Sequence, residues 1–450
     1  MRSSGNPRGL IMQTDFPALP LPWPTDSVLR DELAHLGGPP VIGQGFRRTL
    51  FPVITKEDVL QMQISILRNH STSVAQFTED YRQYVGAPFA IATASGTSSL
   101  HLALIGAGVE PGDEVIVPCF TFIATAQAIV AAKAIPVFVD IDPQTYCVDV
   151  AAVEAAITPR TRVVMPVHVH GLPANMAALR DLCDRHQLAL VEDASHAHSA
   201  SIDGKVCGSL GDAAGQSLMA DKNFPVGGEG GIAFFSDEEK YQRALKFLET
   251  SGIDYAMSGI VASFGISQLK RLGYYDAIRQ RNADYLTAQL ATTGLFSGPT
   301  VPAGYVHSYN MYRIKLHPAA AGLDDLPVHA VKAAVQELLL AEGVPAREWQ
   351  NRPIPGHLPF QNRTGFGNGY PFSLSDRDFS EYQIERFPNT LDMLESTLTL
   401  CRELRSPVET ERIQSYALAF RKIAARPDVI RELATKGEFP LPYQRDSRLG

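Results

Sequence analysis

Short apolar runs alternate along the chain with stretches of helical composition. Runs of this kind, bounded by turn residues, are typical of buried strands, and they cover residues 114–118, 135–140, 161–168 and 188–191. Residues 174–186, by contrast, have the composition of a helix. Strands that alternate with helices favour a mostly parallel, doubly wound sheet. We therefore expect an α/β fold.

The two ends of the chain depart from this central pattern. Residues 1–60 are rich in proline, which predicts an arm rather than a core. Helical spacing appears over 59–67 and 77–85, and again, after Gly322, in an amphipathic helix over 327–343 that ends at a glycine. Further helices are expected over 384–405 and 409–425. The predicted division is an N-terminal arm (1–60), a large domain (61–321), a small C-terminal α/β domain (322–430) and a polar tail (431–450).

One lysine is a candidate for chemistry. Lys222 lies between Ser217 and the glycine-rich turn 227–231, and residues 231–236 are predicted to form a short buried strand. Glycines in such a turn permit positive φ and let the backbone approach a bulky group. The alternative from spacing alone is a surface hairpin with an ordinary solvated lysine.

A second stretch places a carboxylate at the end of a strand. The apolar run 188–191 leads into Glu192 and Asp193, and His196 follows three residues later. Ligands bind at such carboxyl ends in open α/β sheets. A carboxylate there can keep a heterocyclic nitrogen protonated, as pyridoxal phosphate (PLP) requires. Alternatively, Asp193 caps the following helix.

A third stretch, residues 91–104, is a turn of small residues that opens an apolar helix. Gly96, Thr97 and Ser98 lie at its start. Free N–H groups and hydroxyls at a helix N-terminus form a site for phosphate. Simple Ser/Thr capping of the helix is the alternative.

Together these stretches resemble the DegT/DnrJ/EryC1/StrS family of PLP-dependent sugar and cyclitol aminotransferases. The resemblance covers roughly residues 35–425. It rests on motifs in the family's order: Ser95-Gly-Thr-Ser-Ser-Leu100, Gly112-Asp-Glu-Val-Ile-Val-Pro118, Glu192-Asp-Ala-Ser-His196, Ser217 with Lys222, and Gly228-Glu-Gly-Gly231. It implies an aspartate aminotransferase-like (fold-type I) protein that moves an amino group from glutamate or glutamine to a keto-sugar or keto-cyclitol. It also implies a homodimer with shared active sites.

The resemblance implies a role for each matching residue. Lys222 would hold PLP and, once freed, move a proton between the donor's Cα and the cofactor, while Asp193 would pair with the ring nitrogen. His196 would lie beside the ring hydroxyl. Phe122 would stack on the ring, although without the family a buried core residue is the favoured interpretation.

The remaining candidates bind phosphate or substrate. Phosphate contacts are expected from Gly96, Thr97, Ser98 and Ser217. Candidate substrate contacts are His168, Glu229, His307 and Tyr309. His168 and His170 alternate along a predicted strand and face opposite sides, so we expect no metal site there.

One segment departs from the family's pattern. Where the family has Gly-Tyr-Asn-Tyr-Arg-Met, with the Asn contacting the partner's PLP phosphate, this chain has Asp254 and Ala256 in place of the Asn and the Arg. A carboxylate would repel a phosphate. The departure leaves open a PLP enzyme with another outcome, such as dehydration, cyclisation or oxidation of an amino-acid-like substrate. A non-catalytic binding protein is a third hypothesis, disfavoured by Lys222.

Composition narrows the class of protein. The 450 residues carry a net charge of −8 and only two tryptophans, which disfavours a nucleic-acid partner. The five cysteines include no C-x-x-C pair, so neither a disulfide framework nor a thiolate metal site is expected. Neither an export signal nor an apolar run long enough to span a membrane is found. We expect a cytoplasmic enzyme.

Overall fold

The computed structural model describes residues 32–43, 51–67, 70–405 and 410–446. Its largest sheet has seven strands in the order β1-β9-β8-β5-β4-β2-β3. Only β9 runs antiparallel to its neighbours within this sheet, so the mostly parallel sheet is confirmed. The strands are β1 (Phe89–Thr93), β2 (Glu114–Pro118), β3 (Ile135–Val139), β4 (Thr161–Val164), β5 (Ala189–Asp193), β8 (Ala213–Ser217) and β9 (Gly231–Phe235).

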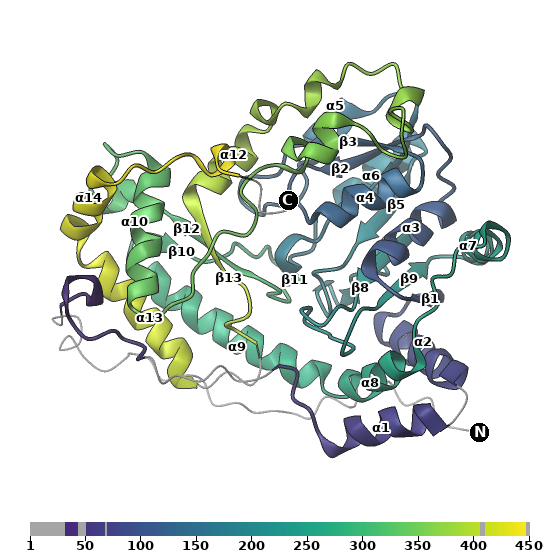
Figure 1. Cartoon of the computed structure of the whole chain (residues 1–450), viewed down its shortest axis with the longest axis horizontal. Helices are drawn as coiled ribbons and strands as arrows, with labels where there is room; N and C mark the ends of the chain where they lie inside the picture. Colours follow the sequence, from purple (N-terminus) through teal and green to yellow (C-terminus); the bar gives the residue numbers. More distant parts are fainter. Residues whose placement is uncertain (1–31, 44–50, 68–69, 406–409, 447–450) are drawn as a thin grey trace.

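Helices cover both faces of this sheet (Figure 1). Alternate residues of a strand point to opposite faces: Phe235 packs in the cluster of α3, α4 and α7, whereas Phe234 packs in that of α2 and α8. Helices α5 and α6 cover the parallel strands through Val153 and Leu179. The helices are α1 (Lys56–Leu67), α2 (His70–Val85), α3 (Gly96–Gly106), α4 (Ile123–Ala131), α5 (Val150–Ala156), α6 (Met176–His186), α7 (Glu238–Ser251) and α8 (Gly259–Leu269).

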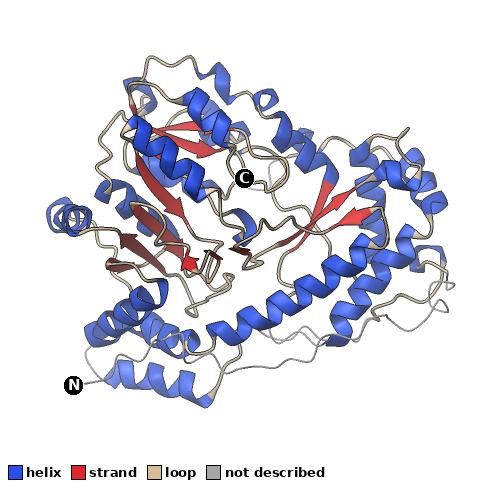
Figure 2. Ribbon diagram, turned by 180° about the vertical axis from the view of Figure 1, so that it is seen from behind, coloured by secondary structure: helices blue, strands red, loops and turns tan. Residues whose placement is uncertain are grey.

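A second unit has its own sheet and its own core. Its strands are β10 (Phe296–Ser297), β12 (Tyr312–Leu316) and β13 (Thr397–Leu400), in the order β10-β12-β13. Figure 2 shows these strands apart from the large sheet, with the long helix α9 (Leu272–Ala291) below both. Helices α10 (Val328–Ala341), α13 (Thr410–Ala424) and α14 (Pro427–Lys436) complete the unit. A short ribbon joins β6 (Ser201–Ile202), β7 (Lys205–Val206) and β11 (Tyr305–Val306).

The core of the second unit is not confined to residues 322–430. It includes Leu286 in α9 and Phe296 in β10, well before the expected boundary, and Leu33 of the expected arm. Ile430 and Ala434 of α14 are buried in it as well, so the expected polar tail begins within a packed helix. Most of the proline-rich arm lies outside the described residues.

The helix predicted over 384–405 was wrong at its end. Helix α12 (Pro388–Ser396) stops, and Thr397–Leu400 form β13, which pairs with β12. Two β-branched threonines alternate there with leucines, and such residues fit a pleated surface. The helices expected over 59–67, 174–186, 327–343 and 409–425 are confirmed, with small shifts at their ends.

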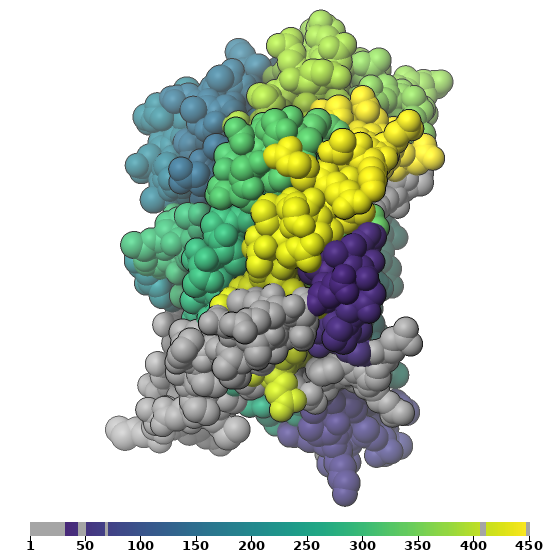
Figure 3. Space-filling model, turned by 90° about the vertical axis from the view of Figure 1, so that its left-hand side faces the viewer, coloured from purple at the N-terminus to yellow at the C-terminus, as the bar shows by residue number. Residues whose placement is uncertain are grey.

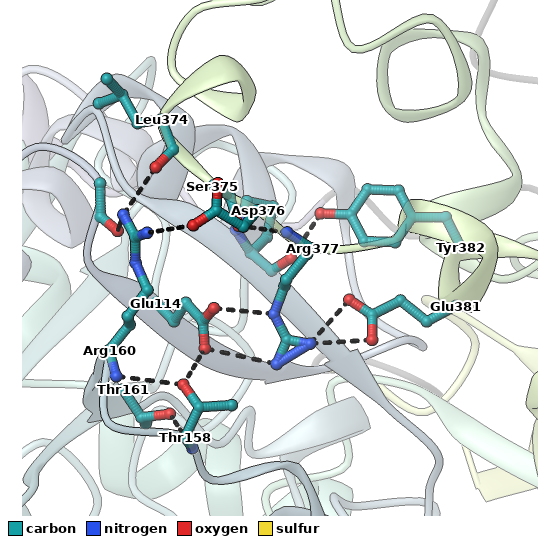
Figure 4. Close-up of polar contacts among 12 residues, drawn as sticks. Glu114, Thr158, Arg160, Thr161, Leu374, Ser375, Asp376, Arg377, Glu381 and Tyr382 are labelled. Atoms are coloured by element: carbon teal, nitrogen blue, oxygen red, sulfur yellow. Dashed lines mark hydrogen bonds and ion pairs between the residues drawn. The ribbon is translucent and has the colours of Figure 1, made fainter.

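After Gln350, the chain returns to the large unit before it forms β13. We call residues 351–396 the excursion. Its residues Ile354, Phe360 and Phe387 are buried in the cluster that covers the large sheet. Figure 4 shows how Arg377 fixes it: its Nε lies 2.9 Å from Oε1 of Glu114 in β2, and its Nη1 lies 2.9 Å from both oxygens of Glu381. Because Glu114 is 1% exposed, its charge depends on that arginine.

The first described segment, residues 32–43, lies against the C-terminal helices (Figure 3). The carboxylate of Glu342 accepts hydrogen bonds from the N–H groups of Ala34 and Val41, both at 2.9 Å. Lys422 of α13 pairs with the same carboxylate at 2.9 Å. A buried ion pair therefore holds this segment on the second unit. Among the described residues, no helix is both long and apolar enough to cross a membrane.

Candidate active site

The candidate residues gather at one edge of the large sheet. Strands β1, β8 and β5 end at this edge with Thr93, Ser217 and Asp193, and the antiparallel β9 begins there with Gly231. The loop from β8 to β9, which carries Lys222, must therefore cross the edge. This is the edge at which doubly wound sheets bind ligands.

A cavity of about 340 Å³ opens at this edge. It is lined by residues of both units, so the site depends on how the two units pack together. The large unit contributes Ser95, Gly96, Thr97, Phe122, Thr125, Asp193, Ser195, His196, Ser217, Lys222 and Glu229, and the second unit and its connections contribute Asn310, Arg347, Trp349, Cys401, Arg402 and Arg405, among others.

Lys222 is half-buried on the wall of this cavity. Burial lowers the pKa of its amine from 10.5 to about 8, against the opposing attraction of Asp193. A larger share of the amine is therefore uncharged near neutral pH than in an exposed lysine. An uncharged amine is the form that attacks a carbonyl group.

Asp193 is 3% exposed at the end of β5. Its Oδ2 accepts a hydrogen bond from the Thr125 hydroxyl at 2.7 Å, and its Oδ1 accepts one from the Ser195 N–H at 3.0 Å. These two hydrogen bonds fix the orientation of the carboxylate. The Ser195 contact is a local turn, because β5 is followed by turns up to β6 and not by a helix. The helix-capping alternative is therefore wrong, and Asp193 lines the cavity.

The N-terminus of α3 supplies free amides. Ser95 is the N-cap, and its hydroxyl accepts the Ser98 N–H at 3.2 Å. The N–H groups of Gly96 and Thr97 have no acceptor within the helix. Gly96 lies so close to β8 that an added Cβ would be 2.5 Å from the Cβ of Ser217. The structure therefore brings two amides and the Ser217 hydroxyl together, as an anion site needs.

Ser98, by contrast, does not line the cavity. Its hydroxyl donates to the Ser95 carbonyl at 2.8 Å and accepts from the Ser95 N–H at 3.1 Å, which completes a capping box. For this residue the structure favours the capping alternative, because its hydroxyl is already engaged.

Two rings lie on the cavity wall. Phe122 is 44% exposed, which excludes the alternative that it is a core residue. His196 is buried, and burial together with the nearby Lys222 holds its pKa well below its usual value. Its imidazole is therefore neutral. Its Nδ1 has no hydrogen-bond partner among the described residues, so it remains available to a ligand.

Of the four candidate substrate contacts, only Glu229 lines this cavity. His307 and Tyr309 stack on each other with ring centroids 4.1 Å apart, and Tyr309 packs in the core of the second unit. His168 lies behind the wall, fully buried, with its Nε2 2.9 Å from Oε2 of Glu192. These three side chains pack in the interior or hydrogen-bond to other residues, and they do not line the cavity.

His168, Glu192 and Cys207 also place donor atoms within 4.8 Å of one another, as a metal site would. The carboxylate of Glu192, however, accepts the N–H groups of Gly208, Leu210 and Gly211 at 2.7–2.8 Å. The Nδ1 of His168 accepts the Ala174 N–H at 3.0 Å, so its Nε2 carries the proton. Through these hydrogen bonds the cluster connects the loop around residue 174 to the loop over residues 208–211.

Sequence reasoning missed several residues of the wall. Thr125 was not singled out because a threonine inside a helical stretch carries no recognisable signal. Arg347, Arg402 and Arg405 come from the second unit, more than a hundred residues from Lys222 in sequence. Only the packing of the two units brings these arginines to one cavity. Trp349 begins a polar loop, residues 349–357, for which the sequence allows a substrate-facing role beside the default of a plain connector.

Asp254 lies away from this cavity. It is exposed in the loop after α7, and its Oδ1 accepts the Ala256 N–H at 2.8 Å in a local turn. The carboxylate therefore takes a structural role within its own loop. In this chain it does not face the anion site that Gly96, Thr97 and Ser217 form.

Comparison with known proteins agrees with this geometry. The model of the DegT/DnrJ/EryC1/StrS aminotransferase family matches residues 54–369. The chain belongs to this family. It is therefore an aminotransferase by descent, and the fold-type I expectation is confirmed: the structure of 3-amino-5-hydroxybenzoic acid synthase superposes with a TM-score of 0.72 at 28% identity, covering 84% of this chain and 99% of that one.

Relatives within the family act on different acceptors. The L-glutamine:scyllo-inosose aminotransferase of Streptomyces griseus is 32% identical over 386 residues, 80% of this chain and 87% of its own length. The UDP-N-acetyl-3-dehydro-alpha-D-glucosamine 3-aminotransferase of Acidithiobacillus ferrooxidans is 36% identical over 283 residues, 60% of this chain and 72% of its own length. The family is thus shown, and its members divide between cyclitol and nucleotide-sugar chemistry.

Proposed function

We propose that this chain is a PLP-dependent aminotransferase that moves the amino group of glutamate or glutamine to a keto-sugar or keto-cyclitol in a biosynthetic pathway. One observation carries the proposal. An amine with a lowered pKa, a hydrogen-bonded carboxylate and a free helix N-terminus line the same cavity, in Lys222, Asp193 and α3.

The residues of this cavity fit the cofactor that the family uses. The amides of Gly96 and Thr97, with the Ser217 hydroxyl, match a phosphate dianion. The Asp193 carboxylate matches a protonated ring nitrogen, and the orphaned Nδ1 of His196 matches a ring hydroxyl. The exposed Phe122 ring offers a face for stacking.

When bound, PLP supplies an electron-accepting ring that makes the Cα–H bond of an amino acid acidic. The amine of Lys222 would tether the cofactor. Once free, its Nζ would take the proton from Cα and return it on the cofactor side, so that one residue acts as tether and as base. Asp193 would pair with the ring nitrogen, and the Thr125 hydroxyl and the Ser195 N–H hold its carboxylate in place for that contact.

The acceptor is the less determined part of the proposal. Cyclitol aminotransferases are among the relatives, and the Leu36–Pro40 and Ala417–Lys422 segments resemble that branch. Both segments lie together on the second unit, where Lys422 donates to the Pro39 carbonyl at 3.3 Å. The resemblance of the two segments to the cyclitol branch, and not their contact, favours a keto-cyclitol over a nucleotide-linked keto-sugar.

The test loads the purified protein with PLP and adds glutamate or glutamine. Borohydride reduction followed by peptide mapping should place the cofactor on Lys222, and a keto acid should be released from one of the two donors. The amino-loaded protein is then offered a panel of keto-cyclitols and keto-sugars, with products followed by mass spectrometry. Label on another lysine would refute the assignment. Turnover of an amino acid without keto acid release would instead support the non-transaminase alternative.

We further propose that the enzyme acts as a homodimer in the cytoplasm. Val59, Leu60, Ile66 and Leu67 of α1 are all exposed apolar residues, more than scattered surface positions explain. All five cysteines are free, as in a reducing compartment. Light scattering on the purified protein tests the oligomeric state, and a monomer at micromolar concentration would refute it.

A further inference from the structure

The last described residues of the chain pack on the second unit. Residues 441–446 follow α14 and contain a short 3₁₀ helix, Pro442–Gln444, in which Pro442 is buried. The hydroxyl of Tyr443 donates a hydrogen bond to Oε1 of Glu395 in α12 at 2.8 Å. We call residues 441–446 the C-terminal strap.

The C-terminal strap contacts the turn 348–352 on both sides of Trp349. On one side, Nη2 of Arg445 lies 2.7 Å from each carboxylate oxygen of Glu348. On the other side, Nδ2 of Asn351 donates a hydrogen bond to the carbonyl of Asp446 at 3.0 Å. The strap therefore holds this turn through a charged side chain and through its own backbone.

The turn depends on contacts of this kind. Backbone hydrogen bonds join Arg347 to Thr399 before the turn and Ile354 to Cys119 after it. Between these anchors, Gln350 has a φ of +63°, a conformation that residues with a side chain rarely adopt. Such a conformation persists where the surrounding structure enforces it.

Trp349 extends from this turn into the active-site cavity. Its indole is partly exposed and lines the cavity. The rings of Phe120, His170 and His196 pack around it, with centroids 5.1–5.5 Å away and ring planes 72–87° apart. Edge-to-face contacts of this kind are an arrangement that aromatic pairs prefer. Because His196 fits the ring hydroxyl of the cofactor, the indole lies next to the proposed cofactor site.

We propose that the C-terminal strap, through Arg445, positions Trp349 as the surface on which the ring of the amino acceptor lies. This rests on the proposed function and adds a binding surface and a positioning residue to it. A keto-sugar or keto-cyclitol carries C–H groups on the faces of its ring, and an apolar aromatic ring matches them. Glutamate and glutamine are extended and charged, so the indole favours the acceptor over the donor.

Fluorescence measures the position of Trp349 directly, because the chain has only two tryptophans. In a Trp23→Phe background, Trp349 is the single indole. In the PLP-loaded protein, Arg445→Gln should raise acrylamide quenching of Trp349 at least about 2-fold, because a turn that loses contacts opens more often. Glu348 keeps Lys332 at 2.6 Å, so its buried charge stays paired and the variant should fold. Quenching equal to that of the parent protein would overturn the proposal.

Kinetics separates the two halves of the transfer. In Arg445→Gln, the KM of the amino-loaded enzyme for a keto-cyclitol should rise about 10-fold with little change in kcat, as expected when uniform binding is lost. The half-reaction with glutamate or glutamine should change by less than about 3-fold. Arg445→Lys, which keeps a charge for Glu348, should lie between wild type and Arg445→Gln. An unchanged acceptor KM, or an equal loss in both halves, contradicts the inference.

A matched control removes another arginine–carboxylate pair near the C-terminus. Arg431 of α14 contacts the two carboxylate oxygens of Asp325 at 2.6 and 2.9 Å, and both side chains are exposed. Arg431→Gln should change neither the quenching of Trp349 nor the acceptor KM. Effects equal to those of Arg445→Gln would mean that general loosening of the C-terminal region, rather than the strap, moves the indole, and that result would also overturn the proposal.

Trp349→Leu removes the ring itself and should raise the acceptor KM at least as much as Arg445→Gln does. A wild-type acceptor KM in this variant would refute the role of the indole. Failure of the proposed function is distinct, since the wild type would then carry no lysine-linked cofactor and release no keto acid, whereas the quenching of Trp349 requires no turnover.

Discussion

The hydroxyl of Thr125 lies 2.7 Å from Oδ2 of Asp193 and donates a hydrogen bond to it in a fully buried setting. Thr125 belongs to the first turns of α4, whereas Asp193 ends β5. The contact joins α4 to the end of β5 at the wall of the cavity. It holds the carboxylate in a fixed orientation.

Thr125→Val should weaken the hold on Asp193 while keeping the shape of the side chain. We expect the pKa of the bound cofactor's ring to shift and turnover to fall about 10-fold, because one hydrogen bond to a charged group contributes about 1.5–3 kcal/mol. Absorbance titration of the loaded enzyme measures the first effect and steady-state kinetics the second. Thr121→Val is the control, since Thr121 contacts Thr125 at 2.8 Å and not Asp193. An equal effect of the two variants would contradict the role of this contact.

The lowered pKa of Lys222 predicts a pH-dependent stability of the cofactor-free protein. Between pH 8 and 10.5 the amine is uncharged in the folded state and protonated in the unfolded state. The unfolded state thus binds more protons, so the free energy of unfolding rises with pH across this window.

Lys222→Met should remove that slope and, below pH 8, should raise the free energy of unfolding by up to about 3 kcal/mol. Urea unfolding at several pH values measures both effects. Lys205→Met, at an exposed position, should leave the slope as it is in the wild type. A wild-type slope in Lys222→Met would show that the amine is not responsible.

Gly96→Ala tests the close contact between α3 and β8. The new Cβ would lie 2.5 Å from the Cβ of Ser217, so the helix must move away from the anion site. We expect a loss of about 1–3 kcal/mol in stability and a PLP affinity at least about 10-fold weaker. Equilibrium dialysis and thermal unfolding measure these. Gly43→Ala, where no described atom lies within 4 Å of the new Cβ, should change neither.

Arg377→Met should loosen the excursion that covers the large sheet. It leaves the buried Glu114 with the Thr158 hydroxyl as its hydrogen-bond donor among the described residues, and we expect a loss of about 3 kcal/mol in the free energy of unfolding. Arg160→Gln removes partly exposed contacts to the same segment and should cost less than about 1 kcal/mol. Denaturant unfolding compares the two. Similar losses would indicate that burial of Glu114 is not the deciding factor.

Local signals made much of the large unit predictable. Strands β2, β3 and β5 are short apolar runs, and Lys222 and Asp193 stand in sequence motifs whose order alone brings them to one edge of a parallel sheet. Ser98 and Tyr309 were misleading because a hydroxyl or a ring in a promising stretch can equally serve a cap or a core. Arg405 could not be predicted, since its place depends on how α9, β12 and β13 pack.

The path of the chain between its two cores limits how this enzyme can be taken apart. Residue 33 lies in the second core, the chain then builds the large sheet, crosses to the second unit through α9, returns with the excursion after Gln350 and crosses again at β13. Neither core is therefore a continuous segment. Truncation between Leu100 and Phe387 separates parts of both cores, so recombination with relatives must exchange interleaved blocks rather than one terminal half.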